Sequence, residues 1–219
     1  SGTLTWQRGP FVAFSVVLLL ILYHVSPMLW YNICKRDWRK DWLVVARKSL
    51  QQQTCCFIGY QEIPPGEERK ILMRVQHRLL PLISSSETNV QFFGLTGEPG
   101  FSQLVADFIM QQQEHQKRLK IILVLPYYGY EDTFSTDSKT HFFKIQKAAS
   151  KVVYVAPAPE RNSTELCYRH LVEGSEYCCF YCTKPSGNVA DAVRYAKQKG
   201  KTLWNASSFD LGHMMQRSK

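Results

Sequence analysis

The stretch that decides the fold is residues 151–205, KVVYVAPAPERNSTELCYRHLVEGSEYCCFYCTKPSGNVADAVRYAKQKGKTLWN. Two apolar runs, residues 152–155 and 177–182, are each followed by a turn and then by apolar residues at helical spacing. A third short run, residues 202–204, follows Gly200. This alternation of strand and helix predicts parallel strand pairing and a sheet that is covered by helices on both faces.

The same alternation continues upstream to Thr54. Strands are predicted at residues 54–59, 89–94 and 120–125, and helices at residues 67–83, 101–113 and 142–149. Residues 126–141, PYYGYEDTFSTDSKTH, are predicted to form a long loop. The simplest fold class that fits this alternation is α/β, with residues 54–205 forming a Rossmann-like, doubly wound, mostly parallel sheet.

The positive charge of the chain is unevenly distributed. The 219 residues carry a formal net charge of +9, yet seven Lys and Arg against two Asp lie within residues 1–50 alone. This concentration beside the most apolar segment is typical of a membrane-flanking cluster. It argues against nucleic acid as the partner of the predicted domain, which is only mildly basic.

The apolar segment, from Phe11 to Cys34, is long enough for one transmembrane helix. A signal peptide would carry its basic residues before the apolar run, and a buried core helix would show a polar face. We therefore expect residues 1–10 to form a short extracytoplasmic tail, residues 35–53 a basic juxtamembrane linker, and the soluble domain to be cytoplasmic. Residues 206–219 are expected to form a C-terminal tail.

The seven cysteines show no disulfide framework. Cys179 and Cys182 have the CxxC spacing, but residues three apart on a strand point to opposite faces of the sheet. We therefore expect reduced, structural thiols in a reducing compartment, and no metal site.

In a doubly wound sheet, ligands bind at loops that follow the carboxyl ends of the strands. We expect the loops at Gly59, Gly97, Tyr127, Arg161 and Gly187 to gather at one edge of the domain. Each of these loops follows a predicted strand.

Two glycine-containing turns before helices are candidate anion sites. Gly97 and Gly100 precede one helix, although the carboxylate of Glu98 between them would repel phosphate, and a purely structural turn is an equal alternative. The turn Ser186-Gly187-Asn188 carries no acid and has Lys184 nearby. It is the preferred anion-binding turn.

Several ordered motifs together resemble a known family. In sequence order they are CCFIG, GEPGF, LVLPY, KVVYV, RHLVEGSE, YCTKPSG and VRYAKQKGK. This order resembles the YpsA-like branch of the SLOG superfamily, whose members are Rossmann-like domains related to the DNA-processing protein DprA and to the lonely-guy nucleoside-monophosphate hydrolases. The resemblance covers residues 54–205 and implies a nucleotide-type ligand.

The same comparison shows departures at the loops. A TGHRP-like turn of the family is represented by residues 58–62, IGYQE, without its His and Arg. The family's GGAxGFD loop is residues 96–102, TGEPGFS, so that Thr96 replaces a glycine and Ser102 replaces the acid. The GGT turn is residues 187–189, GNV.

The resemblance also implies roles for individual residues. It places Arg169 at the ligand cleft, although an ion pair with Glu165 or Glu173 on the same helix is the alternative. Tyr127, with two neighbouring tyrosines, could stack on a base or simply pack the loop. Glu173 is the carboxylate that matches a catalytic position, so Glu173 and Arg169 are the candidates if the domain is an enzyme.

No convincing catalytic set is present, because a glycosidic hydrolase needs a second carboxylate or an equivalent pair. The sequence favours a membrane-anchored, cytoplasmic domain that senses a nucleotide-type ligand without turning it over and that self-associates. The alternatives are a hydrolase of nucleotide N-glycosidic bonds, a scaffold that binds no ligand, and a DprA-like protein that binds single-stranded DNA. No cofactor other than a nucleotide-derived ligand is expected.

Overall fold

A six-stranded sheet forms the centre of the domain. The structure is a computed structural model, and it describes residues 49–208. The strands are β1 Thr54–Gly59, β2 Phe92–Leu95, β3 Lys120–Tyr127, β4 Lys151–Ala156, β5 Tyr177–Tyr181 and β6 Thr202–Asn205. The α-helices are α4 Glu68–Ser84, α5 Phe101–His115, α6 Thr136–Ala148, α7 Ser163–Glu173 and α8 Asn188–Gln198, and a short 3-10 helix, η1, spans Tyr130–Thr133.

The strand order is β4-β3-β2-β1-β5-β6, and all five pairings are parallel. From β1, the sheet is extended in one direction by β2, β3 and β4. The chain then returns and places β5 on the other side of β1. This reversal is a topological switch point, and it lies between β1 and β5. The predicted parallel, doubly wound α/β sheet is confirmed.

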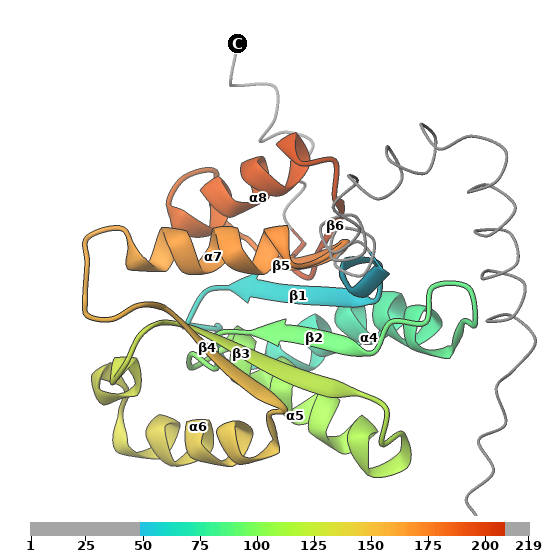
Figure 1. Cartoon of the computed structure of the whole chain (residues 1–219), viewed down its shortest axis with the longest axis horizontal. Coiled ribbons are helices and arrows are strands. Elements are labelled where there is room, and N and C mark those ends of the chain that lie inside the picture. Colours follow the sequence, from blue (N-terminus) through green and yellow to red (C-terminus); the bar gives the residue numbers. More distant parts are fainter. Residues whose placement is uncertain (1–48, 209–219) are drawn as a thin grey trace, which may run out of the picture. The chain divides into compact units, whose positions relative to one another are not determined.

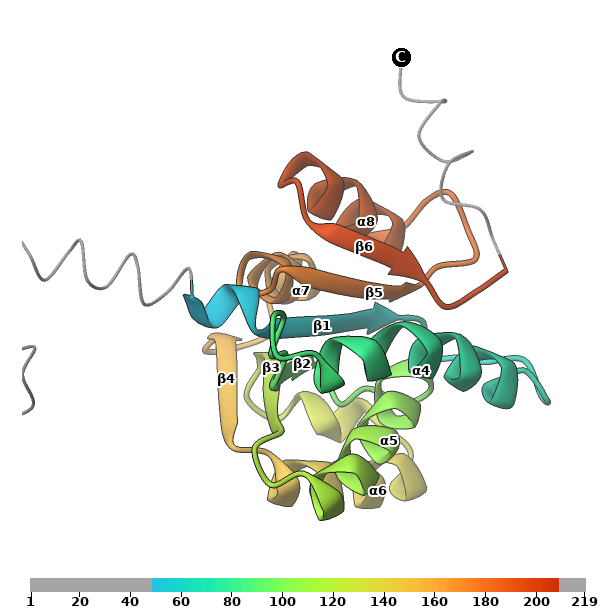
Figure 2. The same cartoon turned by 90° about the vertical axis from the view of Figure 1, so that its right-hand side faces the viewer.

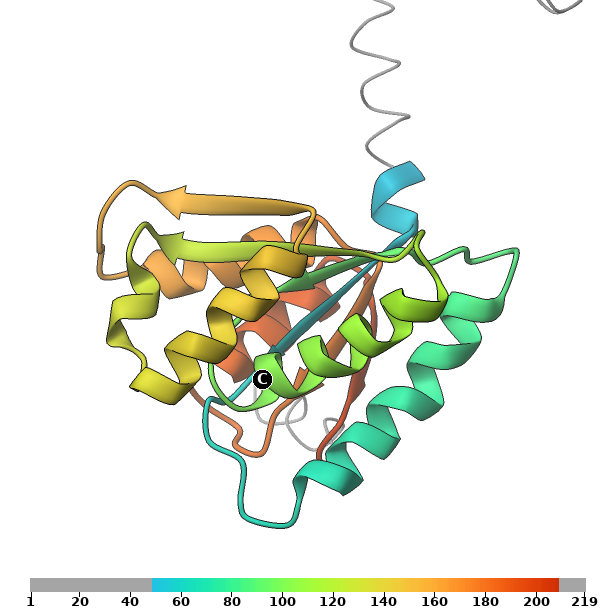
Figure 3. The same ribbon diagram turned by 90° about the horizontal axis from the view of Figure 1, so that it is seen from below.

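The helices cover both faces of the sheet. Helices α4, α5 and α6 lie on one face, and α7 and α8 lie on the other (Figures 1 and 2). Figure 3 shows α6, α5 and α4 side by side across their face. The two groups lie on opposite faces because right-handed crossovers in opposite directions place their helices on opposite sides of a sheet.

Alternating residues of each strand supply the two halves of the core. Cys55 and Phe57 of β1 belong to the half beneath α4, α5 and α6, and Cys56 and Ile58 belong to the half beneath α7 and α8. The CxxC pair follows the same rule, because Cys179 lies in the first half and Cys182 in the second. The expectation that these two side chains diverge is confirmed.

Two predicted boundaries need correction. The segment from 126 to 141 is not one long loop, because β3 continues to Tyr127, η1 follows, and α6 begins at Thr136. The first turns of α6 are polar, so no apolar stripe predicted them, but the hydroxyl of Ser135 caps the helix by accepting from the Ser138 amide. In addition, β2 begins at Phe92 rather than at residue 89.

The predicted membrane helix of residues 11–34 and most of the predicted linker lie outside the described residues, as does most of the C-terminal tail. Within residues 49–208, no helix is both long enough and apolar enough to cross a membrane.

Candidate functional site

An open pocket of about 310 Å³ lies at the switch point, beside the carboxyl ends of the strands. Its walls come from the loops after β1 and β2, from η1, and from the first turns of α7 and α8. We call it the switch-point pocket, and it is lined by Gly59, Tyr60, Gln61, Glu98, Tyr130, Thr164, Tyr168, Asn188 and Val189.

Glu98 is the acidic residue of the pocket, and its side chain is almost completely buried, with the residue 3% exposed. The hydroxyl of Tyr130 donates to its Oε1 at 2.5 Å. The hydroxyls of Thr96 and Tyr168 donate to Oε2 at 3.2 and 3.4 Å. Gln61 extends this network, because its Nε2 donates to the Tyr130 hydroxyl at 3.3 Å.

The electrostatics of this network follow from the loss of water around it. Burial raises the pKa of Glu98, and the hydrogen bonds from Tyr130, Thr96 and Tyr168 offset part of that rise. Burial and the neighbouring Glu98 also raise the pKa of Tyr130 and of Tyr168, so both hydroxyls stay protonated donors. No Lys, Arg or His within residues 49–208 forms an ion pair with Glu98.

The two glycines of the loop after β2 have a structural role and, unlike Glu98 between them, do not line the pocket. Gly97 and Gly100 both have positive φ, and a Cβ on Gly100 would lie 2.1 Å from the carbonyl oxygen of Gln61. The amide of Gly97 donates to Ser102 Oγ at 2.8 Å. Ser102 lies at the position where the YpsA-like sequences that this chain resembles have an acid. These glycines therefore let the loop pack against the β1 loop and turn Glu98 into the pocket.

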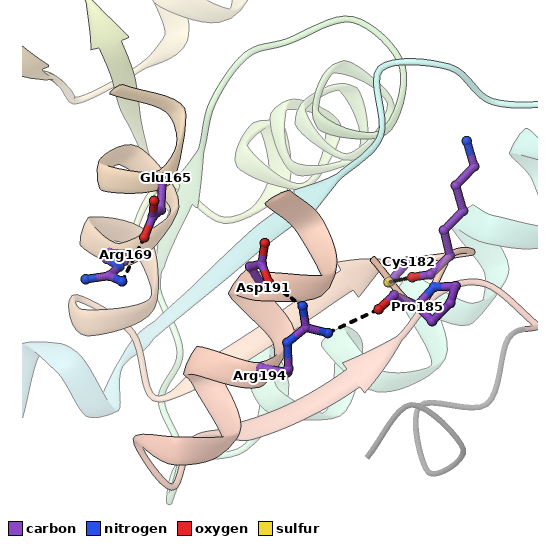
Figure 4. Close-up of polar contacts among 7 residues, drawn as sticks. Glu165, Arg169, Cys182, Pro185, Asp191 and Arg194 are labelled. Carbon is purple, nitrogen blue, oxygen red and sulfur yellow. Dashed lines mark hydrogen bonds and ion pairs between the residues drawn. The ribbon is translucent and has the colours of Figure 1, made fainter. Parts of the chain in front are cut away.

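The turn before α8 lies at the edge of the same pocket. Asn188, the first residue of α8, lines it, and Gly187 has φ +93° with open space where a Cβ would project. Arg194 braces the turn by donating to the Pro185 carbonyl oxygen at 3.1 Å and pairs with Asp191, so the one acid of the first turn is neutralised (Figure 4). Amides at the start of α8 have no intrahelical acceptors and can bind an anion there. Ser186 is exposed beside them.

Arg169 and Glu173 do not line the switch-point pocket. Arg169 pairs with Glu165 at 2.7 Å (Figure 4) and sits 5.1 Å from the ring centroid of Tyr195. It lines a smaller cavity of about 50 Å³ between α7 and α8, which adjoins the switch-point pocket through Tyr168 and Asn188. Glu173, at the far end of α7, accepts a hydrogen bond from the Tyr195 hydroxyl. The structure thus shows the ion pair that was the alternative for Arg169, and a role for Arg169 or Glu173 in ligand binding stays a prediction.

The remaining predicted positions divide between pocket and packing. Gly59 lines the pocket at the end of β1. Tyr127 does not line it, and instead packs its ring edge-on against Tyr130 with centroids 5.3 Å apart. The predicted ligand-binding residues include only two of the nine residues that line the pocket, Gly59 and Asn188. The other seven were not among them: Tyr60, Gln61, Glu98, Tyr130, Thr164, Tyr168 and Val189. Thr164 and Tyr168 lie four residues apart near the start of a predicted helix, and this spacing could have indicated that both face the pocket.

Comparisons with known proteins bear on the fold. No protein-family model matches the chain, and no curated protein matches it. Among solved structures it is similar to DNA processing protein A (DprA) from Streptococcus pneumoniae, with 12% identity, coverage of 78% of this chain and 58% of that one, and a TM-score of 0.54. It also matches DprA from Helicobacter pylori, studied for its single-stranded DNA binding mode, with 14% identity, coverage of 72% and 67%, and a TM-score of 0.49.

The chain thus spans about three fifths to two thirds of these DprA chains. At such identities the likeness concerns the fold, and it supports the Rossmann-like architecture expected from the sequence resemblance. Assignment to the YpsA-like branch stays a prediction.

Proposed function

We propose that the domain binds one nucleotide unit in the switch-point pocket. The observation that carries this proposal is the position and composition of the pocket, which combines three tyrosines, amide and hydroxyl groups and one buried carboxyl at the β1–β5 switch point. Open α/β sheets bind ligands at such points, and a volume of about 310 Å³ suits a small ligand. The resemblance to the SLOG superfamily supports the same ligand class.

The pocket offers different chemistry to the two ends of a nucleotide. Glu98 and Asn188 can accept hydrogen bonds from the N–H groups of a base, and the rings of Tyr60 and Tyr168 provide apolar surface. The amides at the start of α8 and the amine of Lys184, which lies 5.8 Å from the Tyr60 ring centroid, suit the phosphate. The base would therefore lie near Glu98 and the phosphate near Gly187.

The pocket argues for binding rather than for hydrolysis. Among residues 49–208, Glu98 is the one carboxyl group that lines it, and neither Arg169 nor Glu173 does. Cleavage of a glycosidic bond by paired carboxylates would need a second acid facing Glu98.

Titration of the 219-residue chain with the four deoxynucleoside monophosphates tests the proposal. A fixed concentration of non-ionic detergent is included because residues 11–34 are apolar. Glu98→Gln should weaken binding of the preferred nucleotide about 10-fold or more, because it replaces one carboxyl oxygen with an NH2 group that cannot accept a hydrogen bond from the base. Glu114→Gln, an exposed acid on α5, is the matched control and should leave affinity unchanged. Absence of any binding by the unmodified chain would overturn the proposal.

A second candidate is that the nucleotide unit belongs to single-stranded DNA. The observation that favours it is the fold likeness to S. pneumoniae DprA, a protein named for DNA processing. This candidate revises the expectation, drawn from the charge distribution, that nucleic acid is not a partner. An oligothymidylate that binds far more tightly than thymidine monophosphate, with an affinity that falls steeply with salt, would support it. Equal affinity for the two ligands would point to a free nucleotide.

The membrane anchor, the cytoplasmic placement and self-association remain predictions. The anchor rests on residues 11–34 and the basic cluster that follows them.

A further inference from the structure

A second concave surface lies between helix α4 and the edge strand β6, away from the switch-point pocket. It has a volume of about 470 Å³ and is lined by Met73, Arg74, His77, Arg78, Trp204 and Asn205. We call it the α4–β6 groove. It shares no lining residue with the switch-point pocket.

The α4 wall of the groove is basic. Arg74, His77 and Arg78 are spaced so that they share one face of the helix, which flanks the buried face that includes Val75 and Leu79. Arg74 donates to the carbonyl oxygen of Ala206 at 3.1 Å, which fixes this helix to the end of β6. In the part of the chain that the structure describes, no carboxylate forms an ion pair with any of the three.

The β6 wall contributes an aromatic ring. Trp204 is half-buried, and its ring nitrogen is inaccessible to solvent, so the part of the ring that faces the groove is hydrocarbon. Met73, 59% exposed, adds a polarisable side chain on the facing helix. A hydrocarbon ring face beside guanidinium groups offers stacking together with phosphate binding.

We propose that the α4–β6 groove binds single-stranded nucleic acid, with Arg74 and Arg78 contacting phosphates and Trp204 stacking on a base. The proposal shares only its general ligand class with the nucleotide function proposed above. An acidic protein segment would also complement the charge. However, guanidinium groups that have no carboxylate partner within residues 49–208, set around an apolar ring, match the alternation of phosphate and base.

The position of Trp204 allows a direct test. The other four tryptophans, at positions 6, 30, 38 and 42, lie outside the described residues. Replacing those four with Phe in the 219-residue chain leaves Trp204 as the single source of indole fluorescence. Titration with an oligothymidylate of about 12 nucleotides should quench this fluorescence if a base stacks on the ring.

Arg78→Gln is the test variant, because Arg78 is exposed and the helix does not depend on it for packing. It should weaken oligothymidylate binding about five-fold or more and should lower the slope of log affinity against log salt by roughly 0.7. Lys144→Gln, which removes one charge from an exposed position on α6, is the control and should change neither quantity.

Unquenched fluorescence, or equal effects of Arg78→Gln and Lys144→Gln, would overturn the proposal. Displacement of the oligonucleotide by polyglutamate at equal concentration would instead assign the groove to an acidic protein and would also overturn it. The two proposals fail separately. Arg78→Gln should not change the affinity for nucleoside monophosphates, whereas Glu98→Gln should not change the Trp204 quenching by the oligonucleotide.

Discussion

Replacing Glu98 with Gln should change the pH dependence of stability in a defined direction. Glu98 is 3% exposed, and only one of its three hydroxyl donors, Tyr130 at 2.5 Å, is at a short distance. The contacts from Thr96 and Tyr168, at 3.2 and 3.4 Å, are long. Loss of hydration is therefore the larger effect, and it raises the pKa of the Glu98 carboxyl above its ordinary value of 4.5.

The sign of the effect follows from proton binding. Above pH 4.5 the unfolded chain has released the Glu98 proton, whereas the native state still holds it. The free energy of unfolding therefore falls as pH rises, by up to about 1.4 kcal/mol per pH unit, until the pH exceeds the raised native pKa. The stabilising effect of the protonated carboxyl is complete below pH 4.5 and is lost above that native value. Tyr130, Tyr168 and Cys167, which face Glu98, have raised pKa values and do not titrate in this range.

The assay is urea unfolding of the 219-residue chain and of its Glu98→Gln variant from about pH 4 to about pH 8. An amide of similar shape needs no proton, so the variant should gain stability relative to the unmodified chain as pH rises. The difference should grow by up to about 1.4 kcal/mol per pH unit, or about 3–6 °C in Tm. Glu114→Gln should show no such trend. A difference that is constant with pH, or that shrinks as pH rises, would refute the reasoning by showing that the hydroxyls hold Glu98 ionised.

Three further predictions concern the loops and helices around the pocket. Gly100→Ala should lower the free energy of unfolding in urea by about 3 kcal/mol or more, because Gly100 has a positive φ and a Cβ there would clash with the Gln61 carbonyl. Gly66→Ala, which also has a positive φ but open space around it, should lower it by about 1 kcal/mol. Equal losses for the two variants would contradict the packing argument. Tyr130→Phe should lower the free energy of unfolding by about 1–2 kcal/mol, because it removes a hydrogen bond to Glu98. It should also raise the pKa of Glu98 further, so that stability continues to fall with pH up to a higher pH in the same urea assay. An unchanged pH dependence would count against this hydrogen bond. Arg169→Gln should change stability by less than about 0.5 kcal/mol and leave nucleotide affinity unchanged in calorimetry, and a loss of affinity would restore its predicted role at the cleft.

The fold could be predicted because its strands are buried on both faces. The runs TCCFIG and KIILVL are continuous and apolar, and they became β1 and β3. The sequence prediction failed where burial is sparse. Helix α6 buries only Phe142 and Ile145, so its polar first turns carried no periodic signal. Its start is determined by the Ser135 cap, and apolar periodicity gives no information about a polar capping residue.

The edge on which the site lies could be predicted, but most of its side chains could not. A parallel sheet brings its carboxyl-end loops together, and this placed Gly59 and Asn188 correctly beside the pocket. Glu98 was expected to repel phosphate from its loop, and its burial in a hydroxyl network was not predicted, because it depends on two glycines with positive φ that turn the side chain inward. Neighbouring helix positions differ by about 100°, so Tyr168 faces the pocket while Arg169 faces α8. Such rotations depend on packing between distant segments.

The central claim is that the switch-point pocket holds a nucleotide, and a crystal structure of the chain with its preferred nucleoside monophosphate tests it most directly. We expect the base within hydrogen-bond distance of Glu98 and the phosphate beside the amides that follow Gly187. A nucleotide bound at another surface, with the space between Gly59 and Asn188 empty, would contradict the claim.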